Sequence, residues 1–449
     1  MFAVVVVVLL AGYPVAFSLA GTALLFAAVG SIAGIFDPVF LHTMPNRVFG
    51  IMSNVTLIAV PLFVFMGVTL ERAHIAEDLL DTLSQLMGRL RSGLGIAVIL
   101  VGTLMAASTG IVGATVVTMG LLALPTMLKR GYDPSLATGT ITAAGTLGQI
   151  IPPSIVLVLL GDVLSSAYQQ AQLQQGIFRP ETVSVGDLFL GALLPGLLLV
   201  GLYIVYLLGV SLFRPATMPC WEATTDTPTS GLLLRVCKAL IPPLMLIIAV
   251  LGSIISGLAT PTEAAGVGAM GGLLLASARG EMNFSRLFDI CKSTARFSSM
   301  VFMILLGASM FSLVFRGYGG DVAIQEFLTT LPGGRLTALA VVMLTMFLMG
   351  FVLDFIEITF VVVPIVGPAL LAMGFDPVWL GILIAINLQT SFLTPPFGFA
   401  LFYLRSVAPA EVPTSAIYKG VIPFIGIQLL ALLIIAAWPE LATWLPSIF

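Results

Sequence analysis

Long stretches without charge limit most strongly what this chain can fold into. Several windows of about 17 to 25 residues hold almost no ionisable side chain, which is the length a helix needs to cross a hydrocarbon core of roughly 30 Å. Of the 449 residues, 59% are hydrophobic and only 9% are charged. A soluble core of this size does not need so much apolar surface. The sequence therefore predicts an all-α integral membrane protein.

The charge pattern and the cysteines exclude several classes of protein. The net charge of -3 is small and dispersed, and no basic run is interleaved with aromatic residues, so nucleic acid is excluded as a partner. The first twelve residues are apolar without a basic start, and we interpret them as a short first span, not a signal peptide. Both histidines, His42 and His74, lack an evident partner and are expected to be solvated. Three cysteines lie too far apart for a disulfide framework or metal-binding spacing and are expected to be reduced: Cys220, Cys237 and Cys291.

A repeated motif relates the two halves of the chain. The turn Gly131-Tyr132-Asp133-Pro134 recurs as Gly374-Phe375-Asp376-Pro377, and Pro152-Pro153 recurs as Pro395-Pro396. Subtracting 131 from 374, or 152 from 395, gives the same offset of 243 residues. Because the register is kept without a gap across the intervening segment, the sequence predicts a repeat unit of several helices.

The distribution of lysine and arginine predicts that the two repeats are inverted, since short cytoplasmic loops carry the excess of basic residues. Four basic residues bracket the apolar segment of about 93–128 and place both its ends in the cytoplasm: Arg89, Arg91, Lys129 and Arg130. The corresponding segment, about 336–370, is followed by no basic residue before Gly374, so its ends are expected outside. An extra span at about 187–213 makes the number of crossings between the halves odd, as inversion requires. Inverted repeats recur in secondary transporters.

These arguments give expected boundaries for each unit. Repeat one is expected over 1–186, with scaffold helices, an amphipathic interfacial helix at about 73–91, hairpin one at about 93–128 and a broken helix at about 133–167. Residues 187–238 are expected to form a connecting span and a cytoplasmic loop. Repeat two is expected over 239–412, with scaffold helices, an interfacial helix at about 317–335, hairpin two at about 336–370 and a broken helix at about 377–405, followed by a C-terminal span over 413–449.

The segment of about 93–128 is divided in its middle by Ser108-Thr109-Gly110. Each arm holds about 15 residues, which at a rise of 1.5 Å per residue reaches only about 22 Å. This length favours a re-entrant hairpin over two full spans, although the charge distribution is compatible with both. Hairpins and broken helices at membrane depth are tolerated where they are packed in protein or line a cavity.

The second irregular segment is Gly145 to Ser154, where two prolines remove amide donors and two glycines loosen the backbone. Its counterpart, Asn387 to Pro396, is more polar. An unwound helix frees carbonyl oxygens that can coordinate sodium, hydroxyls add ligands, and the N-termini of half-helices offer amides to an anion. The alternative is a proline kink whose freed groups are satisfied by neighbours. Occurrence at equal depth in both halves favours the functional interpretation.

Carboxylates take two kinds of position in this sequence. Asp354 and Glu357 lie in the middle of hairpin two, where charge is costly unless it faces a partner or water. They could bind sodium, bind a proton, shape a solute pocket or form a structural pair. Glu263 is expected to close a capping box with Thr260, and Asp133 and Asp376 are expected to cap the helices that begin at the following prolines.

Taken together, the motifs resemble the DctM-type large membrane subunit of tripartite ATP-independent periplasmic (TRAP) transporters. The resemblance covers essentially the whole chain and rests on five segments: Ala107-Ser108-Thr109-Gly110, Gly131 to Pro134, Leu147 to Ser154, Ala259 to Ala264, and Asn387 with Leu393 to Pro396. It implies a sodium-driven, elevator-type importer of a small organic acid in the bacterial inner membrane. It also implies two partners, a periplasmic substrate-binding protein and a small membrane subunit.

The resemblance also implies site residues. The sodium sites would involve Ser108, Thr109, Gly110, Gly148, Gln149, Ile151 and Pro152, and Asp354, Glu357, Thr359, Thr390 and Thr394. The solute would meet Ser154, Asn387, Gln389 and Ser391. Hairpin one carries Ser-Thr-Gly where Ser-Gly-Ser is common in the family, and hairpin two is more polar than in dicarboxylate carriers. The solute is therefore left open among 2-oxo acids, lactate, C4-dicarboxylates, mannitol and chloroaromatic acids.

Other classes of function fit the sequence less well. An intramembrane protease would need Gly-x-Gly-Asp, but Gly317 to Asp321 has an extra residue, so no enzyme is predicted. No Gly-x-x-x-x-Gly-Lys-[Ser/Thr] motif supports an ATP-driven pump. A channel, or a proton-coupled carrier that uses Asp354 or Glu357, remains as the alternative.

Overall fold

The computed structural model describes residues 1–87, 90–219 and 232–449, so Arg89 and Cys220 lie outside the described residues. Within these ranges every regular element is a helix, as predicted. Six helices are long and apolar enough to cross a membrane, or eight if each of two bent helix pairs counts as one span. The all-α, membrane-spanning class is therefore confirmed.

Helices of the first half run from the N-terminus to the central segment. In order they are α1 (Phe2–Leu10), α2 (Val15–Ile32), η1 (Pro38–Thr43), α3 (Met44–Ser53), η2 (Thr56–Ile58), α4 (Ala59–Arg72), α5 (Ile75–Leu86), α6 (Gly93–Thr109), α7 (Val112–Lys129), α8 (Pro134–Thr146), η3 (Leu147–Gln149), α9 (Ile155–Gln174), α10 (Val185–Phe213) and η4 (Pro215–Thr217). The helix after the first Pro-Pro pair ends at Gln174, beyond the expected limit of about 167.

Helices of the second half follow the central segment. They are α11 (Leu232–Ile255), α12 (Pro261–Ala278), α13 (Phe284–Gly317), α14 (Gly320–Thr330), α15 (Gly334–Met349), α16 (Phe355–Val361), α17 (Val363–Ala372), α18 (Pro377–Leu393), α19 (Phe399–Val407), α20 (Thr414–Ala437) and α21 (Glu440–Ile448). Two features were not expected from the sequence. The second arm of the segment at about 336–370 is itself bent by 58° between α16 and α17, and a short helix, α21, follows the C-terminal span.

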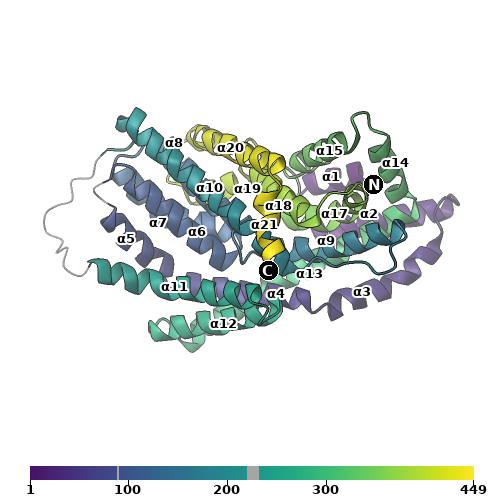
Figure 1. Ribbon diagram of the computed structural model, residues 1–449, viewed down its shortest axis with the longest axis horizontal. Coiled ribbons are helices and arrows are strands. Elements are labelled where there is room, and N and C mark those ends of the chain that lie inside the picture. Colours follow the sequence, from purple (N-terminus) through teal and green to yellow (C-terminus); the bar gives the residue numbers. More distant parts are fainter. Residues whose placement is uncertain (88–89, 220–231) are drawn as a thin grey trace.

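One group of helices forms a layer around α13, which is 34 residues long. Helix α13 packs against α2 and α4, and α12 packs against α4 and α11. Of these, α4, α11 and α12 lie along the lower part of the molecule in Figure 1, and α13 packs beside α4. The helix pair that includes α3 and α4 is bent by 55°, whereas α13 is continuous. We call the group α2, α3, α4, α11, α12 and α13 the outer body.

A second group contains the segments in which hairpins and broken helices were expected. Helix α8 packs against α6, α7 and α20, while α18 packs against α10, α15 and α20. The second halves of the broken helices reach across the molecule, since α9 packs on α17 and α19 packs on α7. We call the group from α6 to α9 and from α15 to α20, with α10, the inner body.

Glycines allow α8 and α20 to touch through their backbones. A Cβ at Gly139 would lie 2.0 Å from the carbonyl oxygen of Gly420, and a Cβ at Gly420 would lie 1.9 Å from the carbonyl oxygen of Ser135. No side chain larger than hydrogen fits at either position without moving the helices apart. The crossing of α8 and α20 therefore depends on both glycines.

Helix caps appear where the sequence predicts them. Thr260 and Glu263 form a capping box at the start of α12, which confirms that prediction. Asp133 accepts hydrogen bonds from the backbone amides of Ser135 and Leu136, and Asp376 accepts one from the amide of Trp379. The caps fix where the two broken helices begin.

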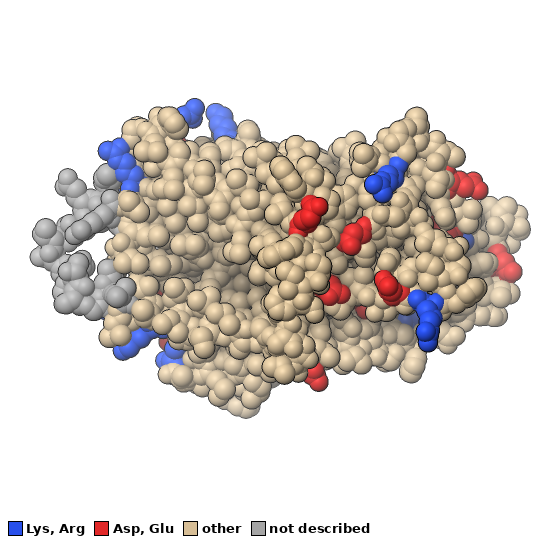
Figure 2. Space-filling view, in the orientation of Figure 1, with Lys and Arg blue, Asp and Glu red and all other residues tan. Residues whose placement is uncertain are grey.

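The surface charge of the molecule is uneven. In Figure 2, many of the visible lysines and arginines lie toward the left end, others lie on the right, and the acidic side chains lie mainly at the centre and right. The short helix α5 is linked to the outer body by an ion pair, in which a carboxylate oxygen of Asp78 lies 2.6 Å from a guanidinium nitrogen of Arg279.

The expectation that His74 lacks a partner is wrong, because its Nδ1 lies 3.3 Å from a carboxylate oxygen of Glu77, one helical turn away.

Candidate functional site

The turn between α6 and α7 presses against the first break. Gly110 ends α6 in the left-handed conformation, with φ of +60°, and a Cβ there would lie 3.1 Å from the backbone nitrogen of Ile155. A Cβ at Gly67 of α4 would lie 2.6 Å from the Cα of Thr109. The turn is thus held between the first residue of α9 and the outer body, tightly at Gly110 and with no space for a side chain at Gly67.

Hydroxyl groups line this turn. Ser108 and Thr109 are buried, and both hydroxyls donate to the carbonyl oxygen of Met105 at 2.9 Å. The hydroxyl of Thr109 also lies 2.9 Å from that of Thr115, which is fully buried. Three hydroxyl oxygens are therefore gathered at this turn, whose Gly110 faces the first residue of α9.

The first break is polar and buried. Helix α8 ends at Thr146, a short 3₁₀ turn follows, and α9 begins after Ser154. The hydroxyl of Ser154 lies 3.0 Å from the carbonyl oxygens of both Gly148 and Gln149, so it satisfies part of the freed backbone. The side chain of Gln149 is fully buried, and neither its oxygen nor its nitrogen has a hydrogen-bond partner among the described residues. An unsatisfied buried amide is costly, so this break is incompletely satisfied by its neighbours.

Ile151 and Pro152 can contribute only backbone carbonyl oxygens. The Ile151 side chain is buried against α10, where a Cβ at Gly196 would lie 2.6 Å from its Cδ1. Pro152 lacks an amide hydrogen and is followed by a cis peptide bond to Pro153, as Pro395 is to Pro396. The predicted role of both residues therefore depends on the direction of their carbonyl groups.

Asp354 and Glu357 form a capping box at the start of α16. A carboxylate oxygen of Asp354 accepts from the amide of Phe355 at 2.6 Å, and a carboxylate oxygen of Glu357 accepts from the amide of Asp354 at 3.0 Å. The hydroxyl of Thr359, one turn further, is fully buried and has no partner among the described residues. The two carboxylates thus have a structural task as the cap of α16.

Two residues predicted to meet the solute, Asn387 and Ser391, form hydrogen bonds between helices. The side-chain amide of Asn387 donates to the carbonyl oxygen of Met343 at 2.8 Å. The hydroxyl of Ser391 donates to the carbonyl oxygen of Phe347 at 2.7 Å. Both pairs link α18 to α15 with the same spacing of one turn. The hydroxyls of Thr390 and Thr394 donate to carbonyl oxygens four residues back in their own segment. In this conformation Asn387 and Ser391 are used in packing.

A buried polar cluster connects the halves. The amide nitrogen of Gln389 lies 3.4 Å from the hydroxyl of Thr146, and that of Gln428 lies 3.4 Å from the same hydroxyl and 2.8 Å from the hydroxyl of Tyr203. All four side chains are fully buried. The side-chain oxygens of both glutamines lack partners among the described residues.

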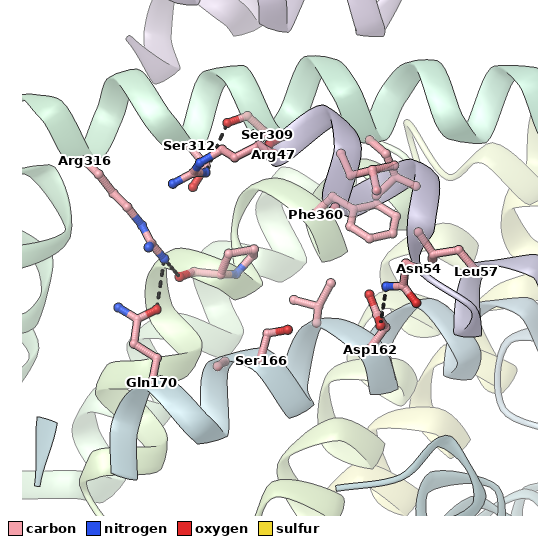
Figure 3. A pocket seen from close by; sticks show the side chains of 16 residues that line it. Arg47, Asn54, Leu57, Asp162, Ser166, Gln170, Ser309, Ser312, Arg316 and Phe360 are labelled. Atoms are coloured by element: carbon pink, nitrogen blue, oxygen red, sulfur yellow. Dashed lines mark hydrogen bonds between the residues drawn. The ribbon is translucent and has the colours of Figure 1, made fainter. Parts of the chain in front are cut away.

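A cavity of about 380 Å³ lies between the two bodies and was not predicted from the sequence. Figure 3 shows Arg47 of α3 and Arg316 of α13 on one side of it, and Asn54 with Asp162 on the other. Its walls come from α3 and α13 of the outer body and from α9, α16 and α17 of the inner body. The cavity is close to the buried polar groups, since Phe360, which lines it, is next to Thr359.

The polar groups of this cavity are unevenly satisfied. The amide of Asn54 donates to a carboxylate oxygen of Asp162 at 2.9 Å. Arg316 donates to the side-chain oxygen of Gln170 at 3.1 Å and to the carbonyl oxygen of Pro364 at 3.4 Å, but its Nε is buried without a partner among the described residues. Arg47 donates only at 3.5 Å, to the carbonyl oxygen of Ser309, among the bonds recorded for it. Among the described residues, neither guanidinium group forms an ion pair.

One sequence signal could have revealed the two arginines. Arg316 stands at the end of a long apolar stretch, and Arg47 lies in a second segment that we place near the outer side of the membrane. Basic residues are scarce on that side, so two of them there are unusual. Their proximity could not be predicted, because it depends on how α3 packs against α13. No cluster of three or more His, Cys, Asp or Glu side chains that could hold a metal ion occurs in the described parts of the chain.

Comparison with known proteins agrees with the fold. The sequence matches the family described as the tripartite ATP-independent periplasmic transporter, DctM component, over residues 2–441. The C4-dicarboxylate TRAP transporter large permease protein DctM of Vibrio cholerae is 30% identical, and the match covers 100% of this chain and 97% of that protein. The sialic acid TRAP transporter large permease protein SiaM of the same organism is 27% identical over 98% of this chain and 96% of that protein.

A solved structure has the same arrangement of helices. The Alcanivorax borkumensis YdaH transporter superposes with a TM-score of 0.66 at 15% identity, covering 97% of this chain and 98% of that one. At this identity the likeness concerns the fold alone. With the family matched over nearly the whole sequence, the chain is not an enzyme but an inner-membrane transport protein, and it belongs to the DctM family of TRAP transporter large permease subunits.

Proposed function

We propose that this chain is the permease of a sodium-coupled importer that carries a small organic acid across the inner membrane by an elevator movement. The observation that carries the proposal is the contact between the α6–α7 turn and the first break, where a Cβ at Gly110 would lie 3.1 Å from the backbone nitrogen of Ile155. This contact gathers hydroxyl and carbonyl oxygens at one buried point. Oxygens of this kind, at an unwound helix, are suited to a dehydrated cation.

The first sodium site would use oxygens of both elements. Ser108, Thr109 and the Gly110 carbonyl come from the turn, and the carbonyls of Gly148 to Pro152 and the amide oxygen of Gln149 come from the break. The second would use Asp354, Glu357, Thr359, Thr390 and Thr394, of which the Thr359 hydroxyl is free of described partners. Gln389 also keeps an unpartnered oxygen and is the strongest of the four proposed solute residues.

An inverted repeat is supported by a contact between equivalent positions. Thr146 and Gln389 are separated by the repeat offset of 243 residues, and their side chains lie 3.4 Å apart. Two positions related by a two-fold axis can touch only if they lie beside that axis. The reciprocal packing of α9 on α17 and of α19 on α7 supports the same symmetry.

An elevator movement would displace the inner body along the outer body. Within the cavity, the contacts between the bodies include two polar pairs, Asn54 with Asp162 and Gln170 with Arg316. Few such contacts would need to break, which suits a sliding surface. The family description and the relatives support a periplasmic substrate-binding protein and a small membrane subunit as partners.

Reconstitution tests the proposal. Uptake of 2-oxo acids, lactate and C4-dicarboxylates is measured in proteoliposomes that hold this chain with its small membrane subunit, given the loaded binding protein, with and without an inward sodium gradient. Saturable uptake that needs sodium and the binding protein is expected. Uptake of every solute that ignores the sodium gradient would contradict the proposal.

The second candidate is a proton-coupled carrier, favoured by the burial of Glu357 next to Asp354 in the capping box. The same vesicles distinguish the two mechanisms. A pH gradient imposed without sodium would then drive uptake, whereas sodium coupling predicts that it does not. Flux without saturation would instead indicate a channel.

A further inference from the structure

The cavity between the outer and inner bodies contains more positive charge than its surroundings balance. Arg47 and Arg316 both line it, and no ion pair is recorded for either of them among the described residues. Asp162, which also lines the cavity, is engaged by Asn54 on the opposite side, as Figure 3 shows. Two half-buried guanidinium groups without a counter-ion are costly, and an anion in the cavity would remove that cost.

The hydrogen bonds of the arginines leave donors available. Arg316 uses one terminal nitrogen for both of its recorded bonds, and its buried Nε has no partner among the described residues. Arg47 makes one recorded bond of 3.5 Å, at the limit of hydrogen bonding. A guanidinium has five N–H groups in a planar fork that matches the two oxygens of a carboxylate. The free donors are thus of the type that binds a carboxylate in two-point fashion.

The remaining walls suit the body of a small organic acid. Ile51, Leu57 and Phe360 give an apolar side, and Ser166, Ser309 and Ser312 bring hydroxyl groups. The volume of about 380 Å³ is at the small end of the range for sites that hold small molecules. A short carboxylic acid fits this combination of charge, size and polarity.

The cavity lies toward the outer side of the membrane. Arg214 directly follows α10, and α13 begins beside Arg286, so the excess of basic residues marks those ends as cytoplasmic. Arg316 is at the opposite end of α13, and Gln170 is near the end of α9, which precedes the outer end of α10. An anion that arrives from the periplasm would meet the cavity before it reaches the buried polar groups.

We propose that Arg47 and Arg316 form a receiving site, in which the carboxylate of the solute is held between the two bodies before it reaches the broken helices. This inference rests on the proposed function. Arg316 contacts α9 and α17, the elements that would move, while it belongs to α13, which would not. A carboxylate that takes its N–H groups would therefore replace contacts between the two bodies and release them from one another.

Uptake kinetics test the role of charge in this receiving site. Arg47→Gln and Arg316→Gln are each expected to raise the KM for the transported acid by about tenfold or more, the loss of one charged hydrogen-bonding group. Arg316→Lys keeps the charge and is expected to restore part of the loss. The matched control is Arg335→Gln, because Arg335 is exposed and stacks on Phe375 outside the cavity. The sodium concentration for half-maximal uptake should stay unchanged in all four.

A binding measurement separates this inference from the proposed function. Ser166 is exposed on the cavity wall, so Ser166→Cys, in a chain whose three native cysteines are replaced by serine, can be labelled by a membrane-impermeant thiol reagent. Lactate, pyruvate or succinate is expected to slow labelling, the corresponding amides are not, and Arg316→Gln should abolish the protection.

Each outcome has one meaning. If uptake depends on sodium but no acid protects the cysteine and both Arg→Gln variants keep the KM of the unmodified chain, the receiving site is wrong while the proposed function stands. If uptake ignores sodium but an acid still protects the cysteine in an Arg316-dependent way, the proposed function fails and the binding site stands.

Discussion

At the scale of single residues, Asp354 and Glu357 combine a structural task with a charge that the task does not require. Their carboxylates cap α16, but asparagine is an equally good N-cap and glutamine fits the third position of a capping box. Neutral side chains would therefore serve the helix as well. The proposed second sodium site would give the two charges at this depth a task beyond capping.

Neutral replacements separate the two roles. In Asp354→Asn and Glu357→Gln the cap remains, so the free energy of unfolding should change by less than about 1 kcal/mol. The sodium concentration for half-maximal uptake should rise by about tenfold or more, because the ion loses a charged ligand. Thermal unfolding in detergent and sodium titration of uptake are the measurements. Unchanged sodium dependence in both variants would assign the pair to capping alone.

The same scale shows what the sequence predicts well. Asp133, Asp376 and the Thr260–Glu263 pair cap helices as expected, because a cap is a contact between residues three positions apart. Asn387 and Ser391 were predicted to meet the solute, yet they donate to α15, more than forty residues earlier. A polar residue in an apolar helix indicates that it has a hydrogen-bond partner, but the neighbouring sequence does not identify that partner.

At the scale of helices, the crossing of α8 and α20 is the most tightly constrained contact described. Gly139→Val should destabilise the protein, since its Cβ would overlap the carbonyl of Gly420, and overpacking of this kind costs about 1–3 kcal/mol or more. Gly426→Val in α20 is the control, because nothing lies within 4 Å of a Cβ at that position. Monodispersity and thermal unfolding in detergent report the difference. Equal stability of the two variants would show that the helices separate freely.

Helix boundaries were predictable where proline and glycine set them. The Pro-Pro pairs place the two breaks, and Gly110 places the turn between α6 and α7. The bend between α16 and α17 was not predicted. Pro364 follows the bend, but the run around it is otherwise apolar and was interpreted as one helix. Such a bend is decided by what α16 and α17 pack against, namely α13 and α9.

At the scale of the whole molecule, the two bodies meet around the arginine cavity. Asn54 belongs to the segment between α3 and α4, and Asp162 belongs to α9, so their hydrogen bond of 2.9 Å joins the bodies. An elevator movement must break this pair in each cycle.

Cross-linking positions 54 and 162 should stop transport. With the native cysteines replaced, Asn54→Cys together with Asp162→Cys, bridged by a short bifunctional thiol reagent, is expected to lose nearly all uptake. Each single cysteine variant treated in the same way should keep its activity, and cleavage of the bridge by a reductant should restore it in the pair. Full uptake by the bridged protein would exclude relative movement of the two bodies at this contact.

The contact between Thr146 and Gln389 has a consequence for the direction of transport. In a perfect inverted repeat, the inward-facing and outward-facing conformations would be images of each other and would have equal free energy. Here one member of the pair is a hydroxyl and the other is an amide, and only the hydroxyl is also within reach of Gln428. Exchanging the roles of the two halves therefore changes the hydrogen bonds at the centre of the molecule. If the proposed elevator movement holds, such unequal pairs would set part of the preference of the empty carrier for one face of the membrane.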